Sequence, residues 1–123
     1  MPRSIETVDR SLPLRERLRV ALPAAVKVRD RHVAAALRSA LGAIDNAEAV
    51  EIGGARAGAI EESAAGLGGA EVARRELSEA DIEGIVRAEI AERLTAAASY
   101  DELGRVDRGD MLRAEADALT AVL

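Results

Sequence analysis

The sequence predicts an all-α protein: a small bundle of about four helices that ends in an antiparallel helical hairpin. Apolar residues recur at helical spacing in several stretches of the 123-residue chain, and glycines separate some of them. The composition is 49% hydrophobic but only 1% aromatic. The core must therefore consist of Ala, Leu, Ile and Val, which suits closely packed helices. The length allows one domain, or one core with an appendage.

The first helix is predicted to follow a polar N-terminus, residues 1–10, that we expect to be loose. Ser11 can cap this helix, and Pro13 falls early in it, where a missing amide costs little. We expect Pro23 to bend the helix without stopping it, and the helix to end at 29–31. Its predicted buried face comprises Leu14, Leu18, Ala21, Leu22, Ala25 and Val26.

A second helix is predicted from about Arg31 to Val50, with Val33, Leu37, Ala40, Leu41, Ile44 and Ala47 on its buried side. Residues 52–77 are a different kind of sequence, with six glycines between positions 53 and 69. They predict a Gly-rich flexible loop inside a helical domain that spans 11–123, with a short helical turn around 60–65. A loop of this length is usually functional or disordered, and disorder or mobility is our first expectation.

The hairpin is predicted over residues 78–123, where the pattern is sharpest. Ser78 and Asp81 have the spacing of a capping box at the start of its first helix. Gly104 follows the last apolar residue of that helix, where a left-handed stop is cheapest for glycine. Asp107 is expected to cap the second helix. The predicted seam consists of Ile82, Ile85, Val86, Ile90, Leu94, Ala97, Leu103, Met111, Leu112, Ala116, Leu119 and Val122.

The charge is unevenly distributed around a formal net charge of -5. Residues 10–38 form a basic front, whereas residues 78–123 are acidic. Overall acidity argues against non-specific nucleic-acid binding, but the front allows a local phosphate-binding patch. An ordinary solvated helix face is the other interpretation. The candidate phosphate contacts are Arg15, Arg19, Lys27, Arg31 and Arg38.

Base stacking finds little support in the sequence, because Tyr100 is the single aromatic residue and cannot form a stacking platform alone. We expect its ring to pack on the hairpin seam with its hydroxyl at the edge.

Catalytic chemistry is also poorly supported. The absence of cysteine excludes disulfides, thiolate metal sites and thiol catalysis. His32, the single histidine, is expected to be a solvated surface residue, and helical carboxylates such as Glu89 are expected to pair one turn on, here with Arg93. We therefore predict no catalytic residues, no metal site and no cofactor.

No long apolar run or leader-like start occurs, so a cytoplasmic location without membrane association is expected.

Several stretches occur together in a fixed order: LRERLRVALPAAVKVRDR, LRSALGAIDNAEAV and RRELSEADIEGIVRAEIAERLTAAASYDELGRVDRGDMLRAEADALTAVL. The best-matching residues are Lys27 to Arg31, Leu37, Arg38, Ala43 to Glu48, Arg93, Tyr100, Gly104, Arg105, Asp107, Leu112, Ala114, Glu115 and Leu119. Over nearly all of residues 12–123 this order and spacing resembles the YqeY family, also called GatB/YqeY domain proteins.

The resemblance implies an all-helical fold similar to the tail region of the B subunit of the glutamine-dependent aspartyl/glutamyl-tRNA amidotransferase. In that enzyme the tail holds tRNA, while ammonia production and amide transfer occur elsewhere. The resemblance thus implies a non-catalytic module that binds tRNA or other RNA, or that serves an amidotransferase as an accessory. The family pattern usually has a shorter connection than 52–77 and continues past the position of Leu123 into a second small helical bundle.

Two other functions stay open. The chain could be a protein-interaction or assembly module, self-association included, in which the acidic hairpin or an exposed Ala/Leu stripe docks a partner helix. It could also contribute to a carbon–nitrogen ligase with glutamine as amido-N-donor, as part of a complex. An amidase nucleophile and an ATP-binding motif are missing from the sequence, so we expect no catalysis by this chain alone.

Overall fold

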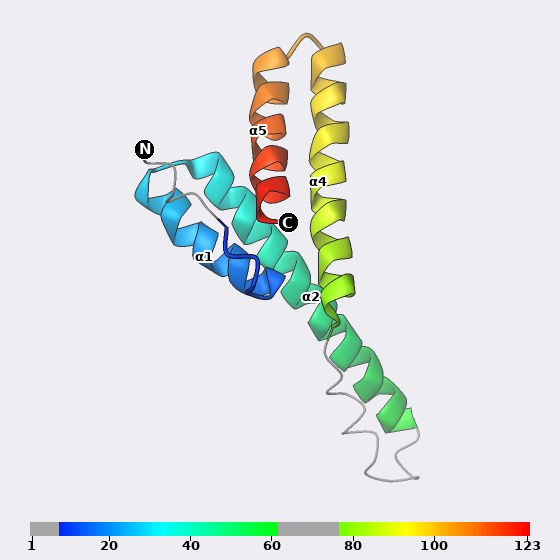
Figure 1. Ribbon diagram of the computed structural model, residues 1–123. Coiled ribbons are helices and arrows are strands. Elements are labelled where there is room, and N and C mark those ends of the chain that lie inside the picture. The colour runs from blue at the N-terminus through cyan, green and yellow to red at the C-terminus, as the bar shows by residue number, and fades with distance from the viewer. Residues whose placement is uncertain (1–7, 62–76) are drawn as a thin grey trace.

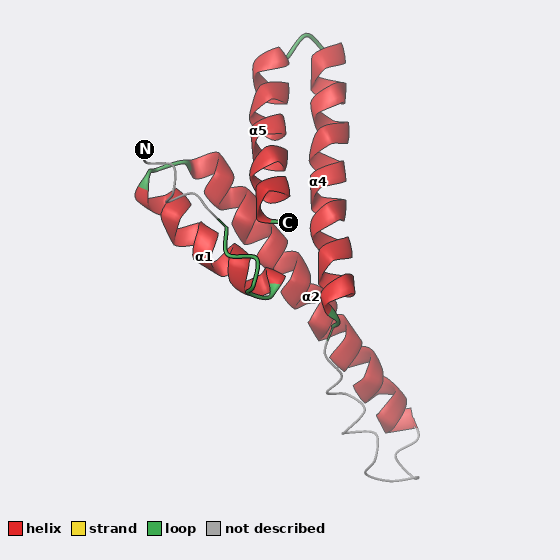
Figure 2. Cartoon of the chain, in the orientation of Figure 1, coloured by secondary structure: helices red, strands yellow, loops and turns green. Residues whose placement is uncertain are grey.

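A computed structural model of the chain describes residues 8–61 and 77–123, with side chains for 8–49 and 77–123. Four α-helices and no strand occur in these residues (Figures 1 and 2). They are α1 (Leu14–Lys27), α2 (Arg31–Glu61), α4 (Glu79–Glu102) and α5 (Val106–Val122). Figure 1 shows α1 folded back along the first part of α2, and α4 beside α5 as an antiparallel hairpin. The predicted all-α bundle with a C-terminal hairpin is confirmed.

The core is aliphatic, and all four helices contribute to it. Its largest fully buried side chains are Leu18, Leu37, Ile44, Val86 and Leu119. Each such side chain contributes about 1.5–3 kcal/mol through its removal from water. None of the four helices, within the described ranges, combines the length and apolar character needed to cross a bilayer.

Most of the predicted buried face of α1 and all of that of α2 is at least partly covered in the structure. Val26 is the exception, with 48% of its surface exposed. Its neighbour Ala25 is only 7% exposed and belongs to the core. Because each residue turns an α-helix by about 100°, Val26 is directed away from α2 once Ala25 faces it.

The start of α1 differs from the prediction, because Ser11 does not cap it. Pro13 is the N-cap residue and provides no side-chain bond. Ser11 instead donates from its amide and hydroxyl to Asp9 Oδ1, at 3.0 and 2.6 Å, and these bonds hold the pKa of Asp9 below its ordinary value. The free amide of Leu14 donates to Oε1 of Glu79, 3.2 Å away in the first turn of α4. The cap of α1 therefore comes from a distant part of the chain.

Both α1 and the segment before it bind the end of α5. Arg17 donates to the carbonyl oxygens of Val122 and Leu123, at 3.0 Å each, and Arg10 donates to that of Ala121 at 3.2 Å. The last carbonyls of a helix have no partner within it and carry its negative dipole end. Two arginines therefore satisfy the C-terminal end of α5.

Between α1 and α2 the chain makes a tight corner. α1 continues through Pro23, as predicted, and ends at Lys27. Arg29 then adopts a left-handed conformation with φ of 62°. Asp30 precedes α2, and its Oδ1 accepts the amide of Val33 at 3.1 Å, which caps the new helix.

The predicted end of the second helix at about Val50 is wrong, because α2 continues to Glu61. Residues 52–61, assigned to a flexible loop from the sequence, are therefore helical. Each glycine in this stretch costs about 1 kcal/mol relative to alanine. Extension of an existing helix, however, gains a hydrogen bond per residue without a new nucleus. The rest of the predicted loop, 62–76, and residues 1–7 of the predicted loose N-terminus lie outside the described residues.

The capping box at the start of α4 is confirmed. Asp81 donates its amide to Ser78 Oγ at 3.0 Å, and Ser78 donates its own amide to Asp81 Oδ2 at 3.1 Å. The stop at Gly104 is confirmed as well, with φ of 77°.

Other details of the hairpin differ. α5 begins at Val106 after Arg105, and no side chain caps it, so Asp107 lies in the first helical turn instead of capping it. There its charge still favours the positive end of the helix dipole. Leu94 and Leu103 are 47% and 72% exposed, so their assignment to the seam was wrong. Leu103 lies after the last residue of α4, where the helical period no longer decides which way a side chain points.

Substitutions at Gly84 and Gly104, which both have open space around them, test the left-handed turn assigned to Gly104. A Cβ added at Gly84 or Gly104 would meet no atom within 4 Å. Gly84→Ala should stabilise the protein by about 0.5–1 kcal/mol, because Gly84 lies inside α4. Gly104→Ala should destabilise it by about 1 kcal/mol, because alanine resists a positive φ. Urea unfolding of both variants measures the two changes, and equal signs would contradict the turn.

Candidate nucleic-acid interface

The five predicted phosphate contacts divide into two groups in the structure. Arg15 and Arg19 are paired with carboxylates. Arg15, with 21% of its side chain exposed, places Nη2 2.9 Å from Glu48 Oε1, an ion pair between α1 and α2 without hydrogen-bond geometry. Arg19 donates to Glu16 Oε2 at 2.6 Å on the surface of α1. These two arginines have carboxylates that compete with a phosphate for them.

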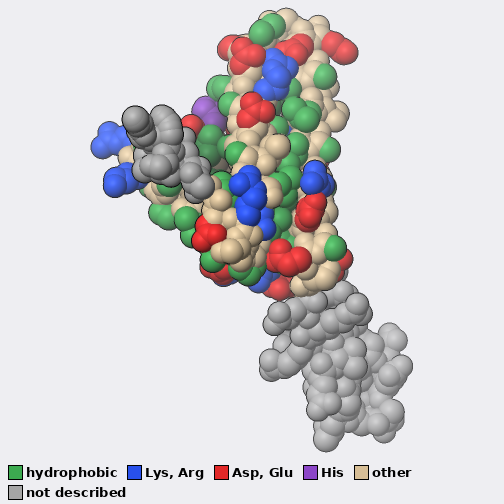
Figure 3. Space-filling model, viewed as in Figure 1, with side chains coloured by type: hydrophobic (Ala, Val, Ile, Leu, Met, Phe, Trp, Pro, Cys, Tyr) green, Lys and Arg blue, Asp and Glu red, His purple; other side chains and the backbone are tan. Residues whose placement is uncertain are grey.

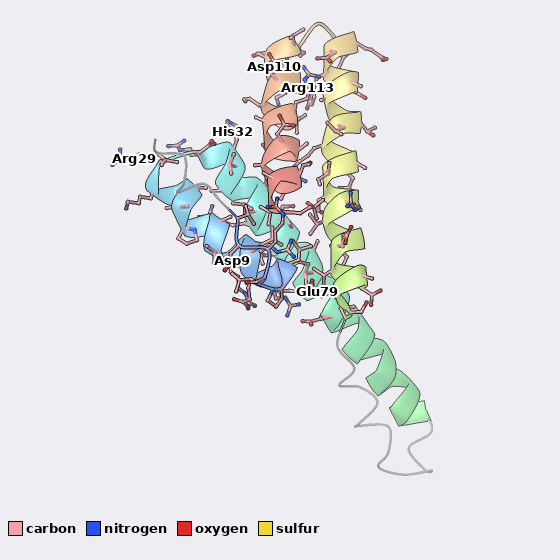
Figure 4. The ribbon with its side chains drawn as sticks, in the orientation of Figure 1. Asp9, Arg29, His32, Glu79, Asp110 and Arg113 are labelled. Carbon is pink, nitrogen blue, oxygen red and sulfur yellow. The ribbon has the colours of Figure 1, made fainter. Side chains whose placement is uncertain are left out.

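Lys27, Arg31 and Arg38 are exposed and have no carboxylate partner among the described residues. Lys27 ends α1, and Arg31 and Arg38 lie seven residues apart on one side of α2, a separation of about 10 Å along the axis. Arg29 lies between them in the chain and is equally unpaired. We call Lys27, Arg29, Arg31 and Arg38 the basic corner. Figure 3 shows Lys and Arg side chains at the end of the molecule where α1 meets α2, and Figure 4 labels Arg29 there.

Arg29 was not among the predicted contact residues. It is the one non-glycine residue with positive φ in the described chain. Its amide donates to Val26 O and the amide of Asp30 to Ala25 O, both at 3.0 Å, so the left-handed residue closes the end of α1. Glycine is the usual residue in this position. The sequence carries no signal for it, because neither glycine nor asparagine, the usual residues at a left-handed helix end, occurs at this position.

His32 borders the basic corner in the first turn of α2 (Figure 4). Its side chain is 53% exposed, as expected for a surface histidine, and its Nδ1 is 3.6 Å from Glu115 Oε2. Among the described side chains, those of residues 8–49 and 77–123, no three of the metal-binding types are placed to hold an ion together.

Behind His32, a largely buried ionic network joins α2, α4 and α5. Arg93 is 13% exposed and donates to Glu115 Oε1 and to Glu89 Oε1, at 2.9 Å each. Ser39 of α2 donates to the same Glu89 oxygen at 2.7 Å. Burial lowers the pKa of Arg93, but its bonds to the two carboxylates outweigh that effect and raise it. The predicted Glu89–Arg93 pair is thus confirmed, and the links to α2 and α5 were not predicted.

Six of the residues quoted for the YqeY resemblance form two groups in the structure. Arg93 and Glu115 meet in the ionic network. Tyr100, Gly104, Arg105 and Asp107 lie around the connection of the hairpin, where the guanidinium carbons of Arg105 and Arg108 are 5.8 and 5.5 Å from the centre of the Tyr100 ring. Tyr100 is half-buried, in agreement with a ring packed on the hairpin.

A scan against protein-family models, a search of curated proteins and a search of solved structures each found no match to this chain. The resemblance to the YqeY family therefore depends on the residues quoted above.

The ionic network predicts a large stability difference between two arginines of α4. Arg93→Met removes the cation between two mostly buried carboxylates and should destabilise the protein by about 3 kcal/mol. Arg87→Met is the matched control: Arg87 forms the exposed pair Glu83–Arg87 one turn apart, and its loss should cost about 0.5 kcal/mol or less. Denaturant unfolding measures both values, and similar costs would show that Glu89 and Glu115 find other partners.

Proposed function

We propose that the chain is a non-catalytic helical module that binds RNA by its phosphates at the basic corner. One observation carries the proposal: the described cations without a carboxylate, carbonyl or aromatic partner are the four residues of this corner. Charges paired inside a protein contribute little to its outer field, whereas unpaired ones attract anions. An otherwise acidic chain thus has a positive surface at one end.

The type of ligand follows from the side chains. Three of the four cations are arginines, whose planar guanidinium binds phosphate oxygens with two parallel hydrogen bonds. Asp30 is the one carboxylate between positions 27 and 38, and its Oδ1 is already engaged by the amide of Val33. Long flexible side chains at the end of α1 and along the first turns of α2 suit the repeated phosphates of a nucleic-acid backbone. Contacts of this kind position a protein without reading sequence.

The kind of nucleic acid proposed here is inferred from the resemblance to the YqeY family. The tail region of the amidotransferase B subunit holds tRNA, so tRNA or another structured RNA is the proposed partner. The chain would act in the cytoplasm, by itself or as an accessory to an amidotransferase whose chemistry takes place elsewhere. Docking of a protein partner is the second proposed function, and it is favoured if RNA does not bind.

Affinity for tRNA at several salt concentrations tests the basic corner. Arg31→Gln combined with Arg38→Gln should weaken binding and flatten the dependence of log K on log salt by about 2, roughly 1 for each lost phosphate contact. The matched control is Arg19→Gln combined with Arg87→Gln, which removes two arginines that carboxylates already hold. It should leave the slope almost unchanged. Absence of tRNA binding by the unmodified chain at low salt would rule the proposal out.

Arg29 allows binding and stability to be separated. Arg29→Gly relieves the left-handed strain of an exposed residue, so the free energy of unfolding should stay the same or rise by up to about 1 kcal/mol. Affinity for tRNA should fall, because one unpaired cation is lost. Arg29→Ala is the control: it removes the same charge but keeps the strain. A binding loss that follows stability instead of charge would contradict a phosphate contact by Arg29.

A further inference from the structure

We propose that the tip of the hairpin is a second RNA contact, where an unpaired base stacks on Tyr100, Arg105 and Arg108. This inference rests on the proposed RNA binding and adds a ligand chemistry that the basic corner lacks. The hairpin tip is defined here as residues 100–108. In Figure 1 it is the end of α4 and α5 that projects furthest from α1 and α2.

The first observation is that two arginines of the tip contact an aromatic ring and no carboxylate. Arg105 and Arg108 lie over the Tyr100 ring, at 5.8 and 5.5 Å, and form no ion pair with a carboxylate. Carboxylates are available nearby, but those of Asp101 and Asp110 bind Arg113 at 2.8 Å (Figure 4 labels Asp110 and Arg113). Aromatic rings and guanidinium planes are both surfaces on which unpaired bases stack. Tyr100 alone could not provide a stacking platform, whereas the three side chains together do.

The second observation is the charge around this platform. Residues 100–113 contain three arginines and four carboxylates. A phosphate would therefore meet a slightly negative surface, in contrast to the basic corner with its four cations and one aspartate. A base carries no charge, and its amino groups can donate to carboxylates. The ligand chemistry that fits the hairpin tip is thus a base and not a phosphate.

The third observation is the apolar surface beside the platform. Leu103 is 72% exposed and Val106 53%. These side chains offer an apolar contact to the edge of a stacked base.

The hairpin tip and the basic corner also lie close enough for one RNA to contact both. Within α5, Glu115, which faces His32 at the corner, lies nine residues after Val106 at the tip, a distance of about 14 Å along the helix axis. A few nucleotides bridge this distance.

The aromatic composition provides a direct experiment. The chain has one tyrosine, one histidine and no phenylalanine or tryptophan. In the aromatic NMR spectrum, Tyr100 therefore reports on the hairpin tip and His32 on the basic corner. The spectrum is followed during titration with tRNA, and separately with a blunt RNA duplex that has no unpaired bases. We expect tRNA to shift both signals and the duplex to shift His32 alone.

Each outcome separates the two proposals. A His32 shift with Tyr100 unchanged at saturating tRNA would overturn the stacking proposal and leave the basic corner intact. A Tyr100 shift with His32 unchanged would support stacking and contradict the corner. Equal Tyr100 shifts with tRNA and duplex would overturn recognition of an unpaired base, and no shift of either signal would overturn both proposals.

A pair of variants adds an affinity measurement. Arg105→Gln combined with Arg108→Gln should weaken tRNA binding about 10-fold, because stacking of one base contributes on the order of 1–3 kcal/mol, while duplex binding changes little. The control is again Arg19→Gln with Arg87→Gln, which should affect neither RNA. Equal losses for tRNA and duplex would show that the two tip arginines act as charges and not as a stacking surface. Circular dichroism melts check that both pairs fold, and the NMR titration of the unmodified chain decides the question should either fail to fold.

Discussion

Arg93 occupies the position on which the arrangement of the hairpin depends. It meets a carboxylate of its own helix and one of α5, and the first of these also holds Ser39 of α2. All three charged side chains are mostly buried, so their attraction is less weakened by water than that of a surface pair. The core around them is made of short aliphatic side chains, which fit one another in many ways. The directional bonds of the Arg93 guanidinium favour one of those packings of α4 against α5, and the bond from Ser39 to Glu89 links this pair of helices to α2.

The two proposed contacts follow from that orientation. One side of the network reaches His32 and hence the basic corner, and α5 leads from the same network to the hairpin tip. The corner is positive because its cations lack partners, whereas the tip has mixed charge and its arginines lie on a ring. One scaffold thus presents two surfaces of different chemistry, and neither requires a cavity.

Sequence patterns predicted the parts of this protein that depend on local interactions. The capping box at Ser78 and the left-handed stop at Gly104 each involve residues at most a few positions apart, and both were found. The cap on α1 was missed because Glu79 lies 65 residues from Leu14. Leu103 was misplaced because helical periodicity does not extend beyond the end of a helix. Of the candidate site, the sequence predicted Lys27, Arg31 and Arg38 but not Arg29, and which arginines are neutralised depends on carboxylates such as Glu48 of another helix.

The bonds at the start of α1 also constrain the order in which the molecule can assemble. A ribosome releases the chain from its N-terminus, so α1 emerges long before the glutamate that caps it. The bond from Arg10 to Ala121 can form only later still, because the two residues are 111 positions apart in the chain. Contacts of such separation form late, after the loop between them has been closed. The bonds of Arg10 and Arg17 to the end of the hairpin are therefore expected to form late, and until then the carbonyls of Ala121, Val122 and Leu123 lack these partners.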